Sequence, residues 1–206
     1  MQDLTAEIAA SAARLVVEEG MEYGPAKRRA QRDLGLEGRR DLALPDNDQL
    51  EDAVREHIEL FHADTQPAEL AALRAVARRW MRRLAEFRPH LTGAVWRGTA
   101  TRWSAVHLQL YGDDPKSVEI ALLNAGVDYD VGSQPGPRGR DIDVLSVADR
   151  SAELGDWVTV HLSVLDHDDL RGALRPDARG RSPRGDLAAL ERLLAAAATP
   201  FPPETR

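Results

Sequence analysis

The sequence predicts an α+β fold, in which an N-terminal helical unit packs on a small mixed β-sheet. Apolar residues recur at three- to four-residue spacing through the first ninety residues, as they do on one face of a helix. After Pro89 the apolar period shortens toward two, which is typical of strands. We therefore expect a helical unit at residues 1–90, an α/β unit at residues 91–198 and a frayed tail at residues 199–206.

Two helices are expected before residue 36. Residues 6–19 place Ile8, Ala12, Leu15 and Val16 on one helical face, and Gly20 ends that helix. A second helix begins at Gly24-Pro25, since proline suits the first turn, and it closes at Gly35.

Two further helices complete the helical unit. Asp46 or Asn47 caps the third, because Asp46 precedes Gln49 with the spacing of a capping box, and this helix runs to about Ala63. The fourth opens at Thr65-Gln66-Pro67 and has the most regular apolar stripe of the chain. The stripe consists of Leu70, Leu73, Ala77, Trp80, Leu84 and Phe87.

The remainder of the chain is predicted to contain most of the strands. Alternating apolar residues mark strands at Ala94–Trp96, Val106–Leu110, Asp141–Val147 and Trp157–Leu165, with a short strand near Tyr129. We expect a helix at 115–125, a loop or hairpin turn at 132–139, a basic linker at 172–185 and a last helix at 186–198.

Composition excludes several kinds of site. The chain has no cysteine, so disulfides, thiolate zinc sites and cysteine nucleophiles are ruled out. The net charge of −7 disfavours bulk electrostatic binding to nucleic acid or to an anionic membrane. No signal peptide is indicated, and no apolar run approaches the roughly 18 residues of a membrane span. We therefore expect a cytoplasmic protein.

A glycine turn between two expected strands is the first candidate site. Glycine lets the backbone approach a phosphate, whose oxygens can then accept bonds from backbone N–H groups and from hydroxyls. The alternative is a strand connection that merely requires a glycine. The predicted phosphate-binding residues are Arg97, Gly98, Thr99, Arg102 and Ser104.

The order of elements around this turn resembles the minimal, polymerase-beta-like nucleotidyltransferase domain over roughly residues 90–165. Gly98-Thr99 stands for the family's Gly-Ser turn, and the segment Ser104–Leu108 stands for its Ser-Asp-x-Asp strand. Ala105, His107 and His161 occupy the positions where the family has its metal-binding carboxylates. The chain also resembles a group of small bacterial proteins without an established reaction, through its Ala26–Ala30 and Leu44–Asn47 motifs.

The missing carboxylates matter because Mg²⁺ requires oxygen ligands, and nucleotidyl transfer requires metals that bridge phosphate oxygens. The resemblance therefore implies a pseudoenzyme that binds a nucleotide, an RNA end or a protein partner, with no metal expected. The alternatives are a divergent nucleotidyltransferase that uses Mg²⁺, and a pure protein-interaction module.

Two residue pairs are candidates for remaining chemistry. Asp141 and Asp143 have the spacing that puts two carboxylates on one strand face, so they are the best substitute metal pair. His107 and His161 lie in mid-strand, where neighbouring rings could bind a transition metal or act as acid and base. The alternative for both pairs is a set of strand residues that face solvent.

Basic residues on two helices are candidates for contact with a nucleotide or RNA backbone. The alternative is a solvated helix face with acidic partners. These residues are Lys27 and Arg28 on the second helix and Arg78, Arg79, Arg82 and Arg83 on the fourth.

Overall fold

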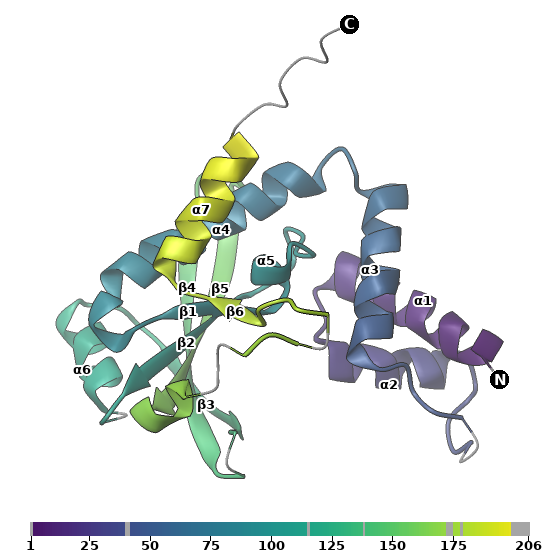
Figure 1. Cartoon of the computed structure of the whole chain (residues 1–206), viewed down its shortest axis with the longest axis horizontal. Coiled ribbons are helices and arrows are strands. Elements are labelled where there is room, and N and C mark those ends of the chain that lie inside the picture. The colour runs from purple at the N-terminus through teal and green to yellow at the C-terminus, as the bar shows by residue number, and fades with distance from the viewer. Residues whose placement is uncertain are drawn as a thin grey trace, which may run out of the picture. The chain divides into compact units, whose positions relative to one another are not determined.

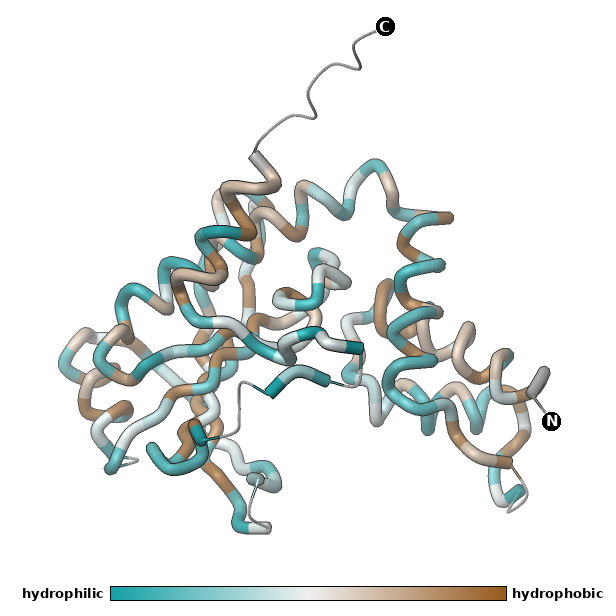
Figure 2. Tube along the Cα trace, viewed as in Figure 1, coloured by the Kyte–Doolittle hydropathy of each residue, from teal (hydrophilic) through white to brown (hydrophobic). Residues whose placement is uncertain are grey.

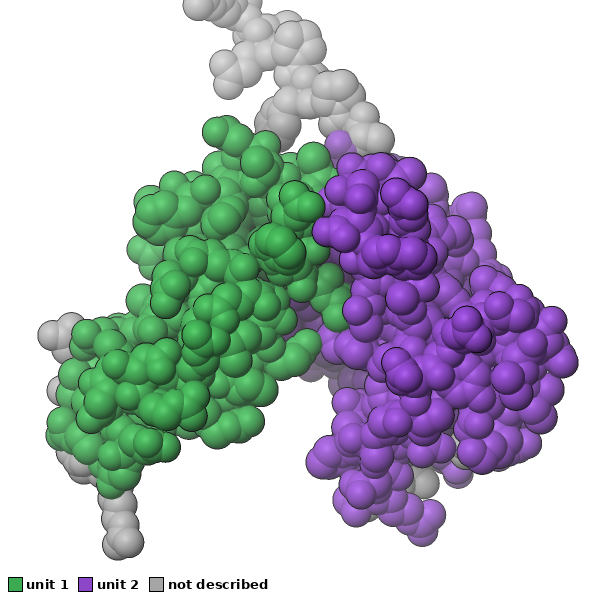
Figure 3. Space-filling view, turned by 180° about the vertical axis from the view of Figure 1, so that it is seen from behind, with its two compact units in different colours: residues 1–70, 98–105 green, residues 71–97, 106–206 purple. Residues whose placement is uncertain are grey.

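The computed structural model describes residues 2–39, 42–114, 116–137, 139–171, 175–177 and 179–198, and it belongs to the α+β class. The predicted frayed tail at residues 199–206 lies outside the described residues. The chain forms two compact units, which Figure 3 colours separately. Unit 1 comprises Met1–Leu70 and Gly98–Ala105, and unit 2 comprises Ala71–Arg97 and Val106–Arg206.

The division therefore differs from the boundary expected at residue 90. It falls inside the fourth helix, after Leu70, and the segment Gly98–Ala105 belongs to the N-terminal unit. Helical periodicity identifies the apolar stripe of a helix but not the element that covers it. For this reason the sequence could not show that the fourth helix contributes to both units.

Unit 1 is built on three helices, α1 (Gln2–Glu19), α2 (Tyr23–Asp33) and α3 (Asn47–Phe61), together with the first turn of α4 (Gln66–Arg83). The predicted capping box of α3 is confirmed. The Gln49 backbone N–H donates to Asp46 Oδ1 at 2.7 Å, and the Asp46 N–H donates to Gln49 Oε1 at 2.9 Å. The tube along α3 changes between apolar and polar with each turn, as an amphipathic helix does (Figure 2).

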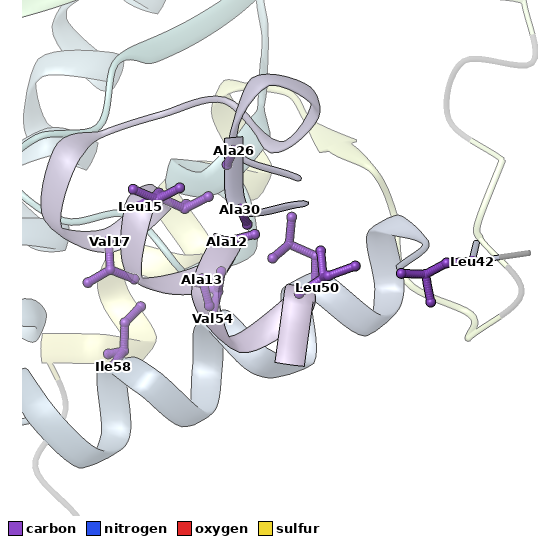
Figure 4. Close-up of a cluster of buried hydrophobic side chains, with 12 residues drawn as sticks. Ala12, Ala13, Leu15, Val17, Ala26, Ala30, Leu42, Leu50, Val54 and Ile58 are labelled. Atoms are coloured by element: carbon purple, nitrogen blue, oxygen red, sulfur yellow. The ribbon is translucent and has the colours of Figure 1, made fainter. Parts of the chain in front are cut away.

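The core of unit 1 contains many alanines. Ala12 and Ala13 of α1 and Ala26 and Ala30 of α2 are completely buried (Figure 4). Because alanine projects only a methyl group, it allows helix axes to approach closely, and larger side chains then fill the remaining space. These larger residues are Ile8, Leu15, Val16, Val17, Leu42, Leu50, Val54 and Ile58.

Unit 2 is organised around a mixed six-stranded sheet with the order β3-β4-β5-β2-β1-β6 (Figure 1). The strands are β1 (His90–Thr92), β2 (Val106–Gly112), β3 (Asp130–Pro135), β4 (Asp141–Ser151), β5 (Asp156–Asp166) and β6 (Arg184–Gly185). Strands β2 and β5 are parallel, and the other neighbouring pairs are antiparallel. The helical elements are η1 (Ala85–Phe87), α5 (Gly93–Arg97), α6 (Lys116–Asn124), η2 (His167–Leu170) and α7 (Leu187–Ala198).

One face of this sheet is an apolar core. Leu91, Leu108, Leu162 and Leu145 pair across four strands, and each is fully buried. The same face carries Asp149 of β4, which accepts a hydrogen bond from Trp80 of α4 at 2.7 Å. Helix α4 therefore covers part of the apolar face, and its Arg82 reaches Glu191 of the neighbouring α7 at 2.6 Å.

Most of the predicted elements are confirmed. All four N-terminal helices, the long strands near residues 106–110, 141–147 and 157–165, the helix near 116–124 and the last helix are present. Leu73 and Trp80 of the fourth helix are buried, and so is Leu84, although α4 ends at Arg83. None of the helices in the described part of the chain has the length and apolar character that crossing a membrane requires.

Three local predictions differ from the structure. The basic linker expected at 172–185 ends in the two-residue strand β6. The strand expected at Ala94–Trp96 is the short helix α5, and three residues are too few for alternation to separate the two conformations. The loop or hairpin turn expected at 132–139 does lie in a β3–β4 hairpin, but it is shorter than expected, since β3 continues to Pro135 and pairs with β4 as an exposed edge. Such an edge has no buried face, and therefore it shows no apolar period.

Candidate functional site

The predicted phosphate turn at Gly98 is packed within unit 1. Gly98 has a φ of +83°, a left-handed backbone that glycine adopts readily, but it follows helix α5 and not a strand. Thr99, Ala100 and Thr101 are 2% exposed or less. A ligand the size of a phosphate has no access to buried residues, so this turn does not support an anion site.

Several backbone groups of the turn are hydrogen-bonded inside the protein, whereas the Thr99 hydroxyl is buried without a hydrogen-bond partner among the described residues. Gln66 Nε2 donates hydrogen bonds to the carbonyl oxygens of Gly98 at 3.1 Å and Ala100 at 2.9 Å. The backbone N–H of Thr101 donates to Ser104 Oγ at 3.0 Å, and the N–H of Arg102 donates to Glu69 Oε2 at 2.9 Å. The segment Gly98–Ala105 is therefore hydrogen-bonded to Gln66 and Glu69 at the start of α4. Arg97, which was predicted to bind phosphate with this turn, lies in the other unit.

The histidine pair lies on the second face of the unit 2 sheet. His107 and His161 occupy matched positions on the parallel strands β2 and β5, and their ring centroids are 5.0 Å apart. His161 Nδ1 and Ser146 Oγ of β4 are hydrogen-bonded at 2.9 Å. Both imidazoles are half-buried. The two rings are neighbours, as the sequence hypothesis required.

These histidines belong to a polar row that crosses the sheet. Residues that pair across neighbouring strands point to the same face, and the strands are about 4.8 Å apart. The row therefore places half-buried donors and acceptors side by side across five strands. In strand order it contains Arg184 (β6), Thr92 (β1), His107 (β2), His161 (β5) and Ser146 (β4).

Next to the row, a buried network positions the arginine. Arg184 Nη1 donates to Gln109 Oε1 and, at 3.0 Å, to Tyr111 Oη, and the Tyr111 hydroxyl donates to Gln109 at 3.0 Å. Burial raises the pKa of the Tyr111 hydroxyl, and the hydrogen bond from Arg184 lowers it in part. Arg184 Nε is buried and has no hydrogen-bond partner among the described residues. The network leaves this arginine with an unused donor.

The aspartate pair does not join the histidines. Ser146 pairs with His161 and shares its face, and Asp143 lies three residues away, so Asp143 and Asp141 point to the opposite face. The two candidate pairs therefore cannot form one site, because the sheet separates them.

The aspartates instead line a pocket of about 220 Å³ at the end of the sheet. The pocket lies at the carboxyl ends of the parallel strands β2 and β5 and at the start of β4. Three of its aspartates, Asp113, Asp166 and Asp169, were not predicted as site residues, although a carboxylate directly after a buried strand is a recognisable signal. Its charged lining consists of Asp113, Arg140, Asp141, Asp143, Asp166 and Asp169.

Several of the basic residues predicted to contact a nucleotide or RNA instead bond to other groups of the protein. Arg79 bonds to Asp149 at 2.6 Å, Arg82 bonds to Glu191, and Arg83 donates to the Ala125 carbonyl at 3.3 Å. Lys27 donates to the Pro45 carbonyl at 3.0 Å and to Asn47 at 2.9 Å. Arg28 is exposed and Arg78 is half-buried. These contacts favour the structural alternative for the clusters over an RNA-binding surface.

No model of a known protein family matches this sequence, and no curated protein matches it either. The functional argument therefore depends on the geometry of the described residues.

Proposed function

We propose that unit 2 is a nucleotidyltransferase-like module that binds a phosphate-bearing small molecule, with a nucleotide as the favoured class, without ordinary two-metal catalysis. The observation that carries this proposal is the polar row Arg184–Thr92–His107–His161–Ser146 on one sheet face. Its arginine, imidazole and hydroxyl groups can all donate hydrogen bonds to phosphate oxygens. The expected anion site moves from the Gly98 turn to this row.

Charge supports an anion as the ligand. None of the five residues of the polar row is acidic, whereas the carboxylates Asp141 and Asp143 lie on the other face of the sheet. The two neighbouring imidazoles can each donate a hydrogen bond to an anion that binds between them. The buried Nε donor of Arg184 adds a fixed positive charge.

Removal of either row histidine is expected to weaken nucleotide binding by roughly 10- to 100-fold, since a hydrogen bond to a charged group contributes about 1.5–3 kcal/mol. The test is an NMR titration of the whole protein with AMP, ATP and inorganic phosphate, for wild type, His107→Ala and His161→Ala.

Thr159→Ala is the matched control, because Thr159 is an exposed residue of β5 two positions from His161 on the same face. It should leave the affinity unchanged. Equal affinities for wild type and both histidine variants would remove the row from consideration.

A second candidate function follows from the acidic pocket. Asp141 and Asp143 share it with Asp113, Asp166 and Asp169, and carboxylates are the ligands that Mg²⁺ prefers. The carboxyl ends of parallel strands are also a common place for ligand binding. Among the possible enzyme mechanisms, this arrangement favours a divergent, Mg²⁺-dependent nucleotidyltransferase over chemistry by the histidine pair.

We expect no transfer of label from ATP, CTP, GTP or UTP to the protein or to bulk tRNA in the presence of Mg²⁺. The measurement is metal-dependent labelling of the wild type, Asp143→Asn and His107→Ala. Labelling that is lost in Asp143→Asn and kept in His107→Ala would establish the enzyme alternative and refute the non-catalytic proposal.

A further inference from the structure

A separate cluster in unit 1 has the composition of a metal site. Glu18 lies at the end of α1, His57 lies in α3, and His62 directly follows α3. One ligand atom from each of these three residues lies within 4.8 Å of the others. Among the described residues they form the one group of three or more histidine and carboxylate side chains that is close enough to hold an ion.

The distances suit a transition metal. His57 Nε2 and Glu18 Oε1 are 3.4 Å apart. Two ligands of a tetrahedral zinc ion, at bond lengths of about 2.0–2.1 Å, are separated by roughly 3.3 Å. The third ligand atom, from His62, lies within 4.8 Å of both.

His57 provides an independent indication of a missing partner. Its side chain is 14% exposed, and its Nε2 atom is buried without a hydrogen-bond partner among the described residues. A buried polar atom without a partner costs about 1–3 kcal/mol. Nε2 lies within ion-pair distance of Glu18 Oε1 but makes no hydrogen bond to it, and an ion between the two atoms would require a similar spacing.

The end of helix α3 brings the second histidine into the cluster. His57 and His62 are five residues apart, a spacing that a continuous helix would place on different faces. However, α3 ends at Phe61, and His62 is its C-cap residue with a φ of −133°. The chain turns there, and the two rings lie with their centroids 5.8 Å apart.

We propose that Glu18, His57 and His62 bind a single divalent transition-metal ion, with zinc as the favoured metal. Two imidazoles and one carboxylate are the ligand types that zinc accepts, and they leave a fourth position for water. The ion ties the C-terminal end of α1 to the C-terminal end of α3. The other Glu18 oxygen contacts exposed Arg14 at 3.4 Å. This proposal is independent of the function proposed for unit 2.

The test is a titration of the metal-free, full-length protein with Zn²⁺ by calorimetry and with Co²⁺ by visible absorption. We expect one ion per chain at this site, and a thermal stability that rises with free metal. Glu18→Gln, His57→Gln and His62→Ala should each weaken binding by about 10- to 100-fold or more, since even changes next to the ligands cost that much.

Glu56→Gln and Glu59→Gln are the matched controls, because they neutralise exposed carboxylates of α3 that lie outside the three-residue cluster. They should keep the Zn²⁺ affinity of this site. NMR of the wild-type imidazoles adds a measurement that does not depend on folding of the variants, since Zn²⁺ should shift the Nε2 resonance of His57. The proposal fails if that resonance does not respond, if the three ligand variants bind as the wild type does, or if only the control variants lose the ion.

Discussion

Replacement of Gly20 by alanine is expected to destabilise the protein by about 2–5 kcal/mol, because it combines backbone strain with a steric clash. Gly20 has a φ of +68°, where L-residues are unfavourable. A Cβ atom at this position would lie 2.2 Å from the backbone carbonyl oxygen of Trp103. That oxygen belongs to the main chain, so it cannot move aside without displacing the Gly98–Ala105 segment of unit 1.

Gly35→Ala separates the two causes. Gly35 also has a φ of +68°, but nothing lies within 4 Å of the place that a Cβ atom would occupy there. We expect this control to cost only the backbone term of about 1–2 kcal/mol. Both free energies of unfolding can be measured by urea denaturation with circular dichroism. Equal losses for the two variants would show that the close approach of Trp103 does not constrain Gly20.

Trp80→Ala is expected to cost about 3–5 kcal/mol of unfolding free energy. Trp80 is 4% exposed, and its Nε1–H donates to Asp149 Oδ2 of β4 at 2.7 Å. Arg79 bonds to the same carboxylate. Truncation of the indole therefore leaves a cavity between α4 and the sheet of unit 2, and it removes one of the three hydrogen bonds that Asp149 Oδ2 accepts from Arg79 and Trp80.

Two other substitutions divide this loss into parts. Trp80→Phe keeps most of the apolar ring and removes the donor, so we expect it to cost about 1–3 kcal/mol. Trp157→Ala truncates a tryptophan that is 65% exposed on β5, and it should change stability by no more than about 0.5 kcal/mol. Chemical denaturation of the three variants provides the comparison. If Trp80→Ala and Trp157→Ala lower the free energy of unfolding by equally small amounts, packing of Trp80 between α4 and the sheet does not stabilise unit 2.

Much of the fold could be predicted because its longer elements carry periodic apolar residues. The helices α1 to α4 and the strands β2, β4 and β5 each have enough turns or alternations for the period to be clear. The strands β1 and β6 have three and two residues, and α5 has five, so their sequences contain no period. The short strands form because they pair with other strands of the sheet, and the few residues of each short element do not specify its conformation alone.

The candidate site was predictable only in part. Alternation placed His107 and His161 in mid-strand, but the register between β2 and β5 makes their rings neighbours. The register between β4 and β5 separates Asp143 from His161, which spacing alone could not show. Arg184 joins the row through a two-residue strand far away in the sequence, so no local signal could have identified it.

The sequence by itself determined the α+β class, through the change of apolar period after Pro89, and the capping box at Asp46, through the spacing of Asp46 and Gln49. Only the tertiary structure decided what surrounds them. Gly98 has the left-handed backbone that only glycine adopts readily, yet Gln66 donates a hydrogen bond to its carbonyl oxygen and buried residues follow it. Glu18 meets His57 and His62 because α1 packs on α3. Such contacts join residues that are distant in sequence, and they are determined by how whole helices and strands bury their apolar faces against one another.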